Sequence, residues 1–415
     1  MSASFTSPLA EALAPGLLER FDRYARIGTQ ARRDRTQSPS SPGQLELGRL
    51  LVDELLELGL ADAAIDDDGY VFATLPGDGP VIGLIAHVDT SPDAPGDGVE
   101  PIVHRGYDGG VLRLPRGGTV LDPEEMPELR GAAGHDVVTS SGDTLLGADD
   151  KAGVAEIMSA VAWLVAHPEL PRPTLRIGFT VDEEVGLGAS RFDVERFGAR
   201  CAYTIDGSSL GELQDETFSG WGVTVTIHGH DVHPGFATGK LVNATRLAGQ
   251  VLAALPPELT PEATSGREGF VHVYEVEGNA ARTEIRAIAR DFDDDLLAAH
   301  LATLRRVAEE VAAAEPRARV EVVARPQYPN MRRFLAGDPE IVEKAAAALR
   351  AEGIEPVRTA IRGGTDGSML SEMGLPTPNL FTGGHEYHSV REWASLQEMA
   401  AAAATIVRLA QEWAA

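Results

Sequence analysis

The run VIGLIAHV, from Val81 to Val88, is the feature that most restricts what this chain can fold into. The run is apolar up to His87 and has the length of a strand. Such runs are typical of strands buried on both faces of a mainly parallel sheet, because strands with one wet face alternate apolar and polar residues instead. The sequence therefore predicts a buried strand here, with His87 near its carboxyl end.

Helix-like and strand-like segments alternate over much of the chain. Leucines recur at helical spacing over 44–60, and a further helix is expected after Lys151. Apolar segments of strand length follow at 174–181 and 201–205, and a last helix is expected at about 395–413. This alternation predicts an α/β fold with a mixed, mainly parallel sheet and flanking helices.

One section of the chain has a different order of predicted helices and strands. Its segments read strand, helix, strand, strand, helix, strand, which is the order of a ferredoxin-like split βαβ unit. A chain of 415 residues also exceeds the usual size of a single core, so two domains are expected. We predict a catalytic domain made of residues 1–213 and 326–415, with an inserted lid-like or dimerisation-like α+β domain at residues 214–325.

The charge of the chain excludes two classes of partner. The 63 Asp and Glu residues outnumber the 36 Lys and Arg residues, and the formal net charge is −27. This charge would repel nucleic-acid phosphates and anionic membrane surfaces, so we expect no nucleic acid and no membrane as a partner. Most of the acids are dispersed along the chain, which is typical of a solvated surface.

The cysteine content and the amino terminus indicate a cytoplasmic protein. Cys201 is the only cysteine, which excludes an intramolecular disulfide and a cysteine-rich zinc module and fits a reducing compartment. The amino-terminal segment lacks the basic region and the apolar run of a secretory signal. The most apolar stretch, around 154–165, contains Glu156 and is too short to cross a bilayer.

Polar clusters follow several of the predicted strands. They are AHVDTSPD at 86–93, LLGADDKAG at 145–153, VDEEVG at 181–186 and YTIDG at 203–207. Open parallel sheets bind ligands beyond the carboxyl ends of their strands, so we expect these clusters to meet at one edge. Any single cluster has an ordinary explanation, since a strand-end Asp often caps a helix and a lone His is often a core residue. Several carboxylates buried together without Lys or Arg partners would be unstable, however, and metal ions would compensate their charge.

The residue types in these clusters indicate the metal. Imidazole and carboxylate ligands without a thiolate favour zinc, with cobalt or manganese as substitutes, and disfavour calcium. In a strand, His87 and Asp89 project to the same face, so Asp89 is expected to accept the second N–H of His87 and fix its tautomer. The adjacent Glu183 and Glu184 cannot serve one ion in equivalent ways, which favours one ligand and one free base. This division indicates hydrolysis.

Several motifs resemble those of the peptidase T family, along nearly the whole chain. They are HVDTSPD, TLLGADDKAG, FTVDEEVG, YTIDG, HPG, IRGGTDG and PNLFTGG. The resemblance implies a zinc-exopeptidase-like fold of the two-zinc aminoacylase and carboxypeptidase clan. It also implies a cytoplasmic metallopeptidase, an aminopeptidase that releases the N-terminal residue of short peptides, mainly tripeptides.

The resemblance further implies a role for each candidate in the site. One Zn²⁺ ion would be held by His87, Asp149 and Asp206, and a second by Asp149, Glu184 and His388. Glu183 would be the general base, which takes a proton from the attacking water and passes it to the leaving amine without a covalent intermediate. Both His385 and His388 follow the FTGG motif. The family has one histidine after this motif, and matching the motif to the family pattern favours His388.

Three further matches concern the substrate. His233, within HDVHPG, resembles a family histidine that helps bind the substrate carbonyl or carboxylate, and Arg290 and Arg362 resemble substrate-anchoring arginines. Arginine suits a carboxylate because its guanidinium donates two parallel hydrogen bonds, although a surface ion pair is an equally ordinary role for Arg290.

The family pattern also bears on one peptide bond and on one segment near the carboxyl terminus. The resemblance implies a cis peptide bond between Asp149 and Asp150. The segment Arg391-Glu392-Trp393 departs from the family, which has a histidine before the acid and the aromatic residue.

Two alternative functions stay open at this point. Related families with the same two-zinc core act as dipeptidases, carboxypeptidases or aminoacylases, and the fold does not separate them. A non-catalytic peptide-binding relative would usually have lost a ligand or the base, whereas this chain keeps candidates for all of them. Small peptides are the expected partners, and the sequence is compatible with a monomer or a homodimer.

Overall fold

The computed structural model describes residues 5–34 and 36–414, and the chain forms two compact units. Unit 1 consists of Met1–Asp215, Arg333–Thr359 and Thr365–Ala415, and unit 2 of Glu216–Arg332 and Ala360–Gly364. Unit 2 therefore includes two segments that the predicted inserted domain at 214–325 leaves out. The last strand of this unit runs beyond residue 325, and the short segment 360–364 joins the unit through contacts such as the hydrogen bond from Phe218 N to Ile361 O at 3.0 Å.

The core of unit 1 is an eight-stranded sheet. Its strands, in order across the sheet, are β1 (Ala64–Ile65), β2 (Val71–Leu75), β8 (Thr174–Thr180), β3 (Val81–His87), β9 (Cys201–Gly207), β16 (Asn379–Phe381), β10 (Glu212–Thr217) and β15 (Val357–Ile361). The central strands β8, β3, β9 and β16 are parallel, whereas β2 and β10 pair antiparallel with their inner neighbours. All residues of β3 after Val81 are buried, as its apolar run predicted. The predicted mixed α/β sheet is confirmed.

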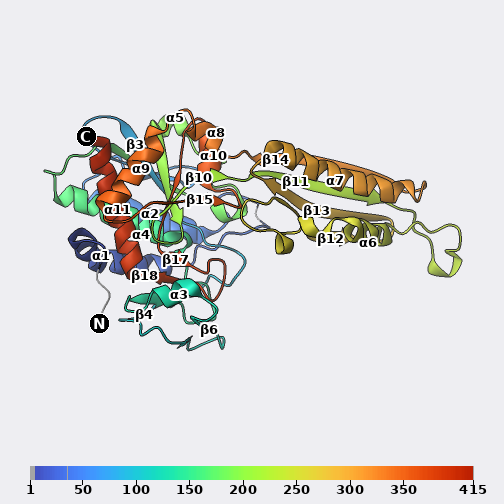
Figure 1. Cartoon of the computed structure of the whole chain (residues 1–415), viewed down its shortest axis with the longest axis horizontal. Helices are drawn as coiled ribbons and strands as arrows, with labels where there is room; N and C mark the ends of the chain where they lie inside the picture. The colour runs from blue at the N-terminus through green and yellow to red at the C-terminus, as the bar shows by residue number, and fades with distance from the viewer. Residues whose placement is uncertain (1–4, 35, 415) are drawn as a thin grey trace. The chain divides into compact units, whose positions relative to one another are not determined.

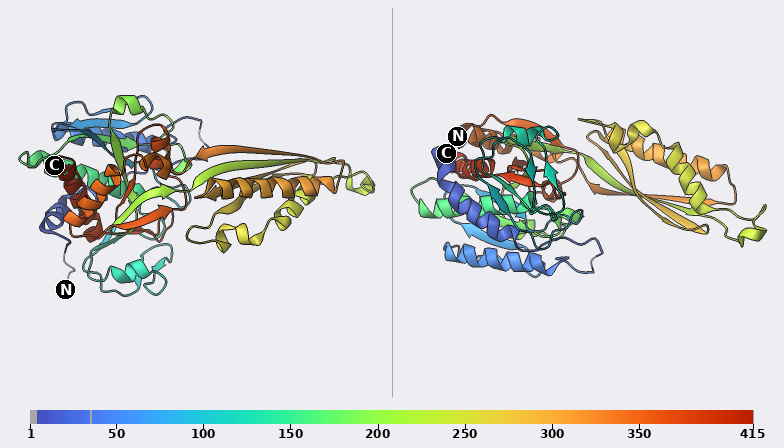
Figure 2. Two further views of the ribbon diagram at one scale, coloured as in Figure 1. Left: turned by 45° about the horizontal axis from the view of Figure 1, so that its top comes forward. Right: turned by 90° about the horizontal axis from the view of Figure 1, so that it is seen from below.

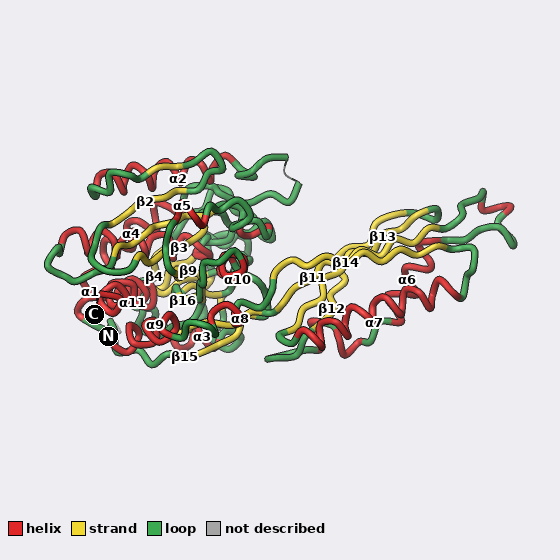
Figure 3. The backbone as a smooth tube through the Cα atoms, turned by 90° about the horizontal axis from the view of Figure 1, so that it is seen from above, coloured by secondary structure: helices red, strands yellow, loops and turns green. Residues whose placement is uncertain are grey.

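Long helices pack against this sheet and against one another. They are α1 (Pro8–Ala25), α2 (Pro42–Glu57), α4 (Ala148–Ala166), α9 (Glu340–Ala351) and α11 (Leu396–Ala414). Helix α4 contacts β3 and β9, α11 contacts α1, α4 and α9, and α2 contacts β1 and β2. Helices α1 and α11, from opposite ends of the chain, lie side by side (Figure 1 and Figure 3). The amino-terminal helix begins with a capping bond, in which Ser7 Oγ accepts from Ala10 N at 3.1 Å.

A smaller four-stranded sheet joins distant segments of unit 1. Its strands, in order, are β17 (Gly384–His385), β18 (Trp393–Ser395), β7 (Val137–Thr139) and β4 (Ile102–His104). Strand β18 pairs antiparallel with both β17 and β7. The segment after the FTGG motif is thereby attached to the strand that precedes the LLGADDKAG cluster.

Unit 2 contains strands and helices in the order expected from the sequence. They are β11 (Ser219–His228), α6 (Ala244–Ala254), β12 (Phe270–Gly278), β13 (Arg282–Asp291), α7 (Asp294–Ala313) and β14 (Arg319–Tyr328). The strands form an antiparallel sheet in the order β12-β13-β11-β14. Helices α6 and α7, yellow and orange in Figure 2, lie on one face of this sheet. Alternate residues of β11, such as Val223 and Val225, are buried in the core on this face.

The two units also contain shorter strands, helices and turns. They are β5 (Leu112–Arg113), β6 (Val120–Leu121), α3 (Pro127–Gly131), α5 (Val194–Phe197), α8 (Arg332–Leu335), α10 (Asp366–Glu372) and the 3₁₀ turns η1 (Glu183–Val185), η2 (Pro234–Phe236), η3 (Pro257–Leu259) and η4 (Pro261–Ala263). Among the described residues, no helix combines the length and the apolar character needed to cross a membrane.

Candidate metal centre

Most of the candidate ligands lie at or just after the carboxyl ends of the central strands of unit 1, at one edge of the sheet. His87 is the last residue of β3, and Asp206 is next to the last residue of β9. Glu184 lies in η1, shortly after β8, and Asp149 lies in the first turn of α4. Because β3, β8 and β9 are parallel, their carboxyl ends meet, as the sequence predicted.

A first group of potential ligands consists of His87, Asp149 and Asp206. Nε2 of His87 lies 2.9 Å from Oδ1 of Asp149 and 3.7 Å from Oδ1 of Asp206. One ligand atom of each residue lies within 4.8 Å of the others. The His87 side chain is buried, so the group is anchored in the interior of unit 1.

A second group consists of Asp149, Glu184 and His388. Nε2 of His388 lies 2.9 Å from Oε2 of Glu184 and 3.2 Å from Oδ2 of Asp149. Asp149 therefore directs one carboxylate oxygen to each group. The structure brings all the predicted ligands together, with Asp149 shared, and the peptide bond between Asp149 and Asp150 is cis, as the family resemblance implied.

The structure separates the two histidines that follow the FTGG motif. His388 has a left-handed backbone, with φ of 59°, and joins the second group. His385 is buried elsewhere in unit 1: its Nε2 bonds Glu398 at 2.9 Å, and its ring stacks on Trp393 with 4.2 Å between centroids. His388 is therefore the histidine at the candidate centre.

Asp89 has a different principal contact from the one predicted. The nearest acceptor to Nδ1 of His87 is the backbone carbonyl of Asp89 at 3.1 Å, and the Asp89 carboxylate is 3.4 Å away. The two carboxylate oxygens instead accept the backbone N–H groups of Glu183 and Glu184, at 3.0 and 3.1 Å. Asp89 thus contacts the histidine and also holds the turn that carries the two acids.

Asp182 supports the same turn, and the sequence did not single it out. It is fully buried, with φ of 60°, and directly precedes Glu183. Its carboxylate accepts hydrogen bonds from Ser38 Oγ at 2.8 Å, Ser40 N at 2.9 Å and Gln44 Nε2 at 2.9 Å. Its position within VDEEVG was the only sequence signal, since its partners come from a separate segment.

Burial controls the ionisation of most acids at this centre. It raises the pKa of Glu183 well above the ordinary value, and it raises the pKa of Glu184 to about 8 and that of Asp206 to about 6. Burial acts in the same direction on Asp149, but hydrogen bonds from His388 and His87 overcome it and lower the pKa of Asp149. Burial lowers the pKa of His388, but its bonds to Asp149 and Glu184 raise that pKa to about 11. Cations bound among these acids would stabilise their charged forms.

The donor set fits a pair of zinc ions. It offers imidazole nitrogens and carboxylate oxygens without thiolates, a combination that zinc accepts. Oε1 of Glu184 is buried and has no hydrogen-bond partner in the described part of the chain. Such an oxygen is stabilised by a further ligand, because a buried polar atom left unsatisfied is costly.

The predicted substrate-binding arginines lie next to each other in unit 2. Arg362 donates hydrogen bonds to the carbonyl and the hydroxyl of Thr264, both at 2.9 Å, and to the carbonyl of Glu268 at 3.0 Å. Arg290 donates a longer bond of 3.5 Å to the carbonyl of Arg362 and lies 5.9 Å from the ring centroid of Tyr328. Arg362 is thus the more fully bonded of the two.

His233, the third predicted substrate-binding residue, also belongs to unit 2. It is exposed and lies at the N-cap of η2. Its Nδ1 accepts the backbone N–H of Gly235 at 3.1 Å, so Nε2 is the ring nitrogen available to bind a ligand.

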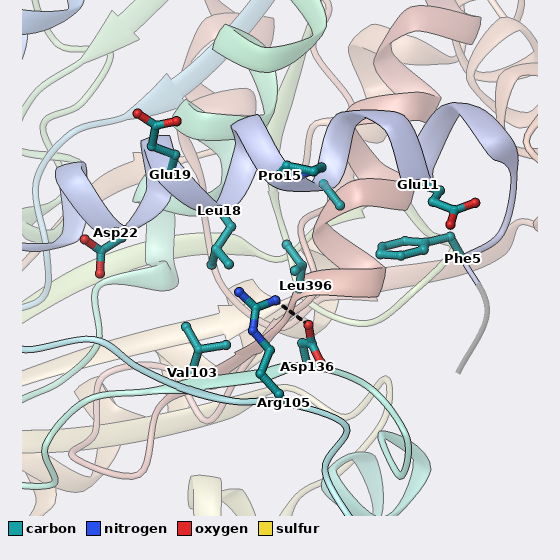
Figure 4. A pocket seen from close by; sticks show the side chains of 11 residues that line it. Phe5, Glu11, Pro15, Leu18, Glu19, Asp22, Val103, Arg105, Asp136 and Leu396 are labelled. Atoms are coloured by element: carbon teal, nitrogen blue, oxygen red, sulfur yellow. Dashed lines mark hydrogen bonds and ion pairs between the residues drawn. The ribbon is translucent and has the colours of Figure 1, made fainter. Parts of the chain in front are cut away.

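A separate pocket of about 650 Å³ lies beside α1 in unit 1 (Figure 4). It is lined by Phe5, Glu11, Ala14, Pro15, Leu18, Glu19, Asp22, Val103, Arg105, Asp136 and Leu396. Arg105 and Asp136 form an ion pair of 2.6 Å on its wall. None of its lining residues was predicted to be functional, so the metal centre remains the candidate site.

Comparisons with known proteins agree with these features. The chain is 45% identical to peptidase T of Bacillus subtilis (strain 168) over 402 residues, which cover 96% of this chain and 98% of the relative. The structure is similar to that of the aminopeptidase PepT from Bacillus cereus ATCC 10987, with a TM-score of 0.75, 25% identity, and 97% and 99% of the two chains covered.

A more distant structural relative has the same fold. It is a dinuclear metal binding peptidase of the M20 family from Bacillus subtilis, with a TM-score of 0.63, 19% identity, and 97% and 98% of the chains covered. Residues 143–412 of this chain match peptidase family M20/M25/M40. The chain therefore belongs to peptidase family M20/M25/M40 and, within it, is a relative of the peptidase T enzymes that its sequence motifs resembled.

Proposed function

We propose that this peptidase is a zinc-dependent aminopeptidase that releases the N-terminal residue of short peptides, mainly tripeptides. One observation carries the proposal: Asp149 directs one oxygen to each of two ligand groups, while Glu183 stands beside Glu184 and belongs to neither group. Two adjoining ligand groups with a free acid beside them fit a two-metal hydrolase, in which the ions activate a water molecule and a separate base takes its proton. The similarity to peptidase T supports the class of substrate.

The two ligand groups define which residues would hold the ions. His87, Asp149 and Asp206 would hold one Zn²⁺, and Asp149, Glu184 and His388 the other, with Co²⁺ or Mn²⁺ as possible substitutes. When bound, the ions would supply Lewis acidity that polarises the scissile carbonyl and makes a water molecule more acidic. The carboxylates and imidazoles would also keep the ions in fixed positions relative to Glu183.

Glu183 would move the proton in this reaction. Its backbone N–H is held by Asp89, and the preceding residue, Asp182, is bonded to the segment 38–44, so the carboxylate is carried on a fixed turn. Burial raises the pKa of Glu183, which suits a group that first accepts a proton from water and then donates it to the leaving amine.

Unit 2 would supply groups that recognise the rest of the peptide. We assign the terminal carboxylate to Arg290, with Arg362 and His233 as further substrate-binding residues. Arg362 already donates three hydrogen bonds within unit 2, whereas Arg290 donates a single long one, so Arg290 has more donors left for a carboxylate.

A panel of di-, tri- and tetrapeptides, incubated with zinc-replete protein, tests the proposal. We expect fastest release of the N-terminal residue from a free tripeptide and no release from its N-acetylated form. Release of the C-terminal residue, or preferential cleavage of dipeptides or acylated amino acids, would instead support the carboxypeptidase, dipeptidase or aminoacylase alternatives. The cytoplasmic location and the choice between monomer and homodimer stay predictions.

A further inference from the structure

Glu392 is a buried carboxylate that binds the loop leading to Asp149. Its side chain is 1% exposed. Oε2 accepts the backbone N–H groups of Leu146 at 2.7 Å and Gly147 at 2.8 Å, and Oε1 accepts the backbone N–H of Asp149 at 3.0 Å. One side chain therefore satisfies donors on both sides of the first residue of α4.

The bonded loop cannot satisfy these donors by itself. The first N–H groups of a helix have no partner within the helix. Gly147, at the N-cap of α4, has φ of 78° and no side chain to act as a cap, and Asp149 and Asp150 have non-helical backbone angles. Glu392 therefore acts as a helix cap supplied by another part of the chain.

The position of Asp149 decides the geometry of both ligand groups. Its Oδ1 lies 2.9 Å from His87 Nε2, and its Oδ2 lies 3.2 Å from His388 Nε2. A shift of the Asp149 backbone would move both oxygens at once. The bond from Asp149 N to Glu392 opposes such a shift.

Glu392 also connects two ligand-bearing segments. It follows His388 closely in sequence and directly precedes β18, which pairs with β7. Through its three hydrogen bonds, the segment that carries His388 is attached to the loop that carries Asp149.

We propose that Glu392 is a positioning residue for both metal ions, which sets the distance between the Asp149 and His388 segments before any ion binds. This role rests on the proposed ligand set. It does not require Glu392 to touch a metal ion or the substrate.

Glu392→Gln is the sharpest test, because it changes the hydrogen bonding without changing the shape of the side chain. The amide has one acceptor oxygen and one NH₂ group, which faces a backbone N–H in either orientation. The variant would lose the bond to Asp149 in one orientation and the bonds to Leu146 and Gly147 in the other. Glu392→Asp keeps both acceptor oxygens on a shorter side chain and serves as a second variant.

Asp66→Asn is a matched control. Asp66 Oδ1 accepts the backbone N–H groups of Asp68 at 3.0 Å and Tyr70 at 2.9 Å, in a turn that contains none of the candidate ligands. The control therefore neutralises a carboxylate that binds backbone N–H groups elsewhere in unit 1, while the remaining amide oxygen can still accept both of them.

Metal affinity of the full chain, measured by competition with a chelator, should separate these variants. We expect Glu392→Gln to bind both Zn²⁺ ions about 10- to 100-fold more weakly, the range seen when groups that orient metal ligands are removed. Glu392→Asp should lose less affinity, and Asp66→Asn should match the wild type. The absorption spectrum of the Co²⁺-loaded protein should change in Glu392→Gln and stay the same in Asp66→Asn, even where both variants lose similar thermal stability.

Wild-type affinity and an unchanged Co²⁺ spectrum in both Glu392 variants would overturn the positioning role. An Asp149→Asn variant, measured in parallel, tests the ligand set separately. If that variant loses both ions while the Glu392 variants keep them, only the positioning role fails. If Asp149→Asn binds both ions as the wild type does, the proposed ligand set fails instead.

Discussion

Nε2 of His388 lies 2.9 Å from Oε2 of Glu184, which places Glu184 in a candidate metal-ligand group that does not include its neighbour Glu183. The backbone N–H groups of both acids are held by the same carboxylate, that of Asp89. Their side chains can therefore take different roles from one fixed turn.

Glutamine substitutions should separate these roles. Glu183→Gln should retain both zinc ions but lose at least about a hundredfold in kcat, because an amide cannot accept the proton from water. Glu184→Gln should lose metal and activity together. Metal content and kcat measured on the same samples check this, and the opposite pattern would show that the two assignments are exchanged.

Asparagine substitutions should distinguish the shared ligand from a ligand of one group. Asp149 belongs to both groups and Asp206 to the first alone, so Asp149→Asn should weaken the binding of two ions and Asp206→Asn that of one. Stoichiometry from elemental analysis after dialysis against a weak chelator provides the measurement. Equal losses in the two variants would contradict Asp149 as the bridge.

The bonds of Asp182 should matter for turnover more than for metal binding. Asp182→Asn replaces one acceptor oxygen that faces Ser40 and Gln44, so the turn that carries Glu183 should move. Displacements near 1 Å at a catalytic group can cost up to about a hundredfold in rate, and we expect at least roughly a tenfold loss in kcat. Ser38→Ala, which removes a single bond to the same carboxylate, should cost less. A wild-type kcat in Asp182→Asn would exclude this support role.

The two arginines of unit 2 should respond differently to truncation. Arg290→Ala should raise KM for tripeptides about 10- to 100-fold, the equivalent of one lost charged hydrogen bond, without changing zinc content. Arg362→Ala should raise KM less than Arg290→Ala does, and it should also lower the thermal midpoint, because it removes three hydrogen bonds within unit 2. Unchanged kinetic constants in Arg290→Ala would leave that residue without a role in substrate binding.

Glu156 should make the stability of unit 1 depend on pH. It is fully buried in α4, neither carboxylate oxygen has a hydrogen-bond partner among the described residues, and burial raises its pKa well above the ordinary value of 4.5. The folded chain therefore keeps a proton that the unfolded chain releases above about pH 4.5, so the stability falls as pH rises toward the folded pKa.

Glu156→Gln removes this titration. Its stability gain over the wild type should grow by up to about 1.4 kcal/mol per pH unit above pH 4.5. Denaturant unfolding of the metal-free proteins at several pH values measures the difference, with the same substitution at the exposed Glu57 as the control. A gain that does not change with pH would contradict a protonated Glu156.

The sequence by itself determined the features that depend on local pattern. The apolar run at 81–88 predicted a strand buried in a parallel sheet, and the polar residues after successive strands predicted a ligand site at one sheet edge, with His87 among its members. These inferences succeeded because hydrophobic periodicity and strand direction are local properties of the chain. The family motifs added His388, which no periodicity could have separated from His385.

Only the tertiary structure decided which residues support the site. The Asp89 carboxylate was expected to orient His87, yet it mainly bonds the Glu183–Glu184 turn. Asp182 and Glu392 bond residues far from them in sequence. Such contacts have no sequence period, because they depend on which segments the packed sheets place side by side and on which backbone N–H groups a bent loop leaves without a partner.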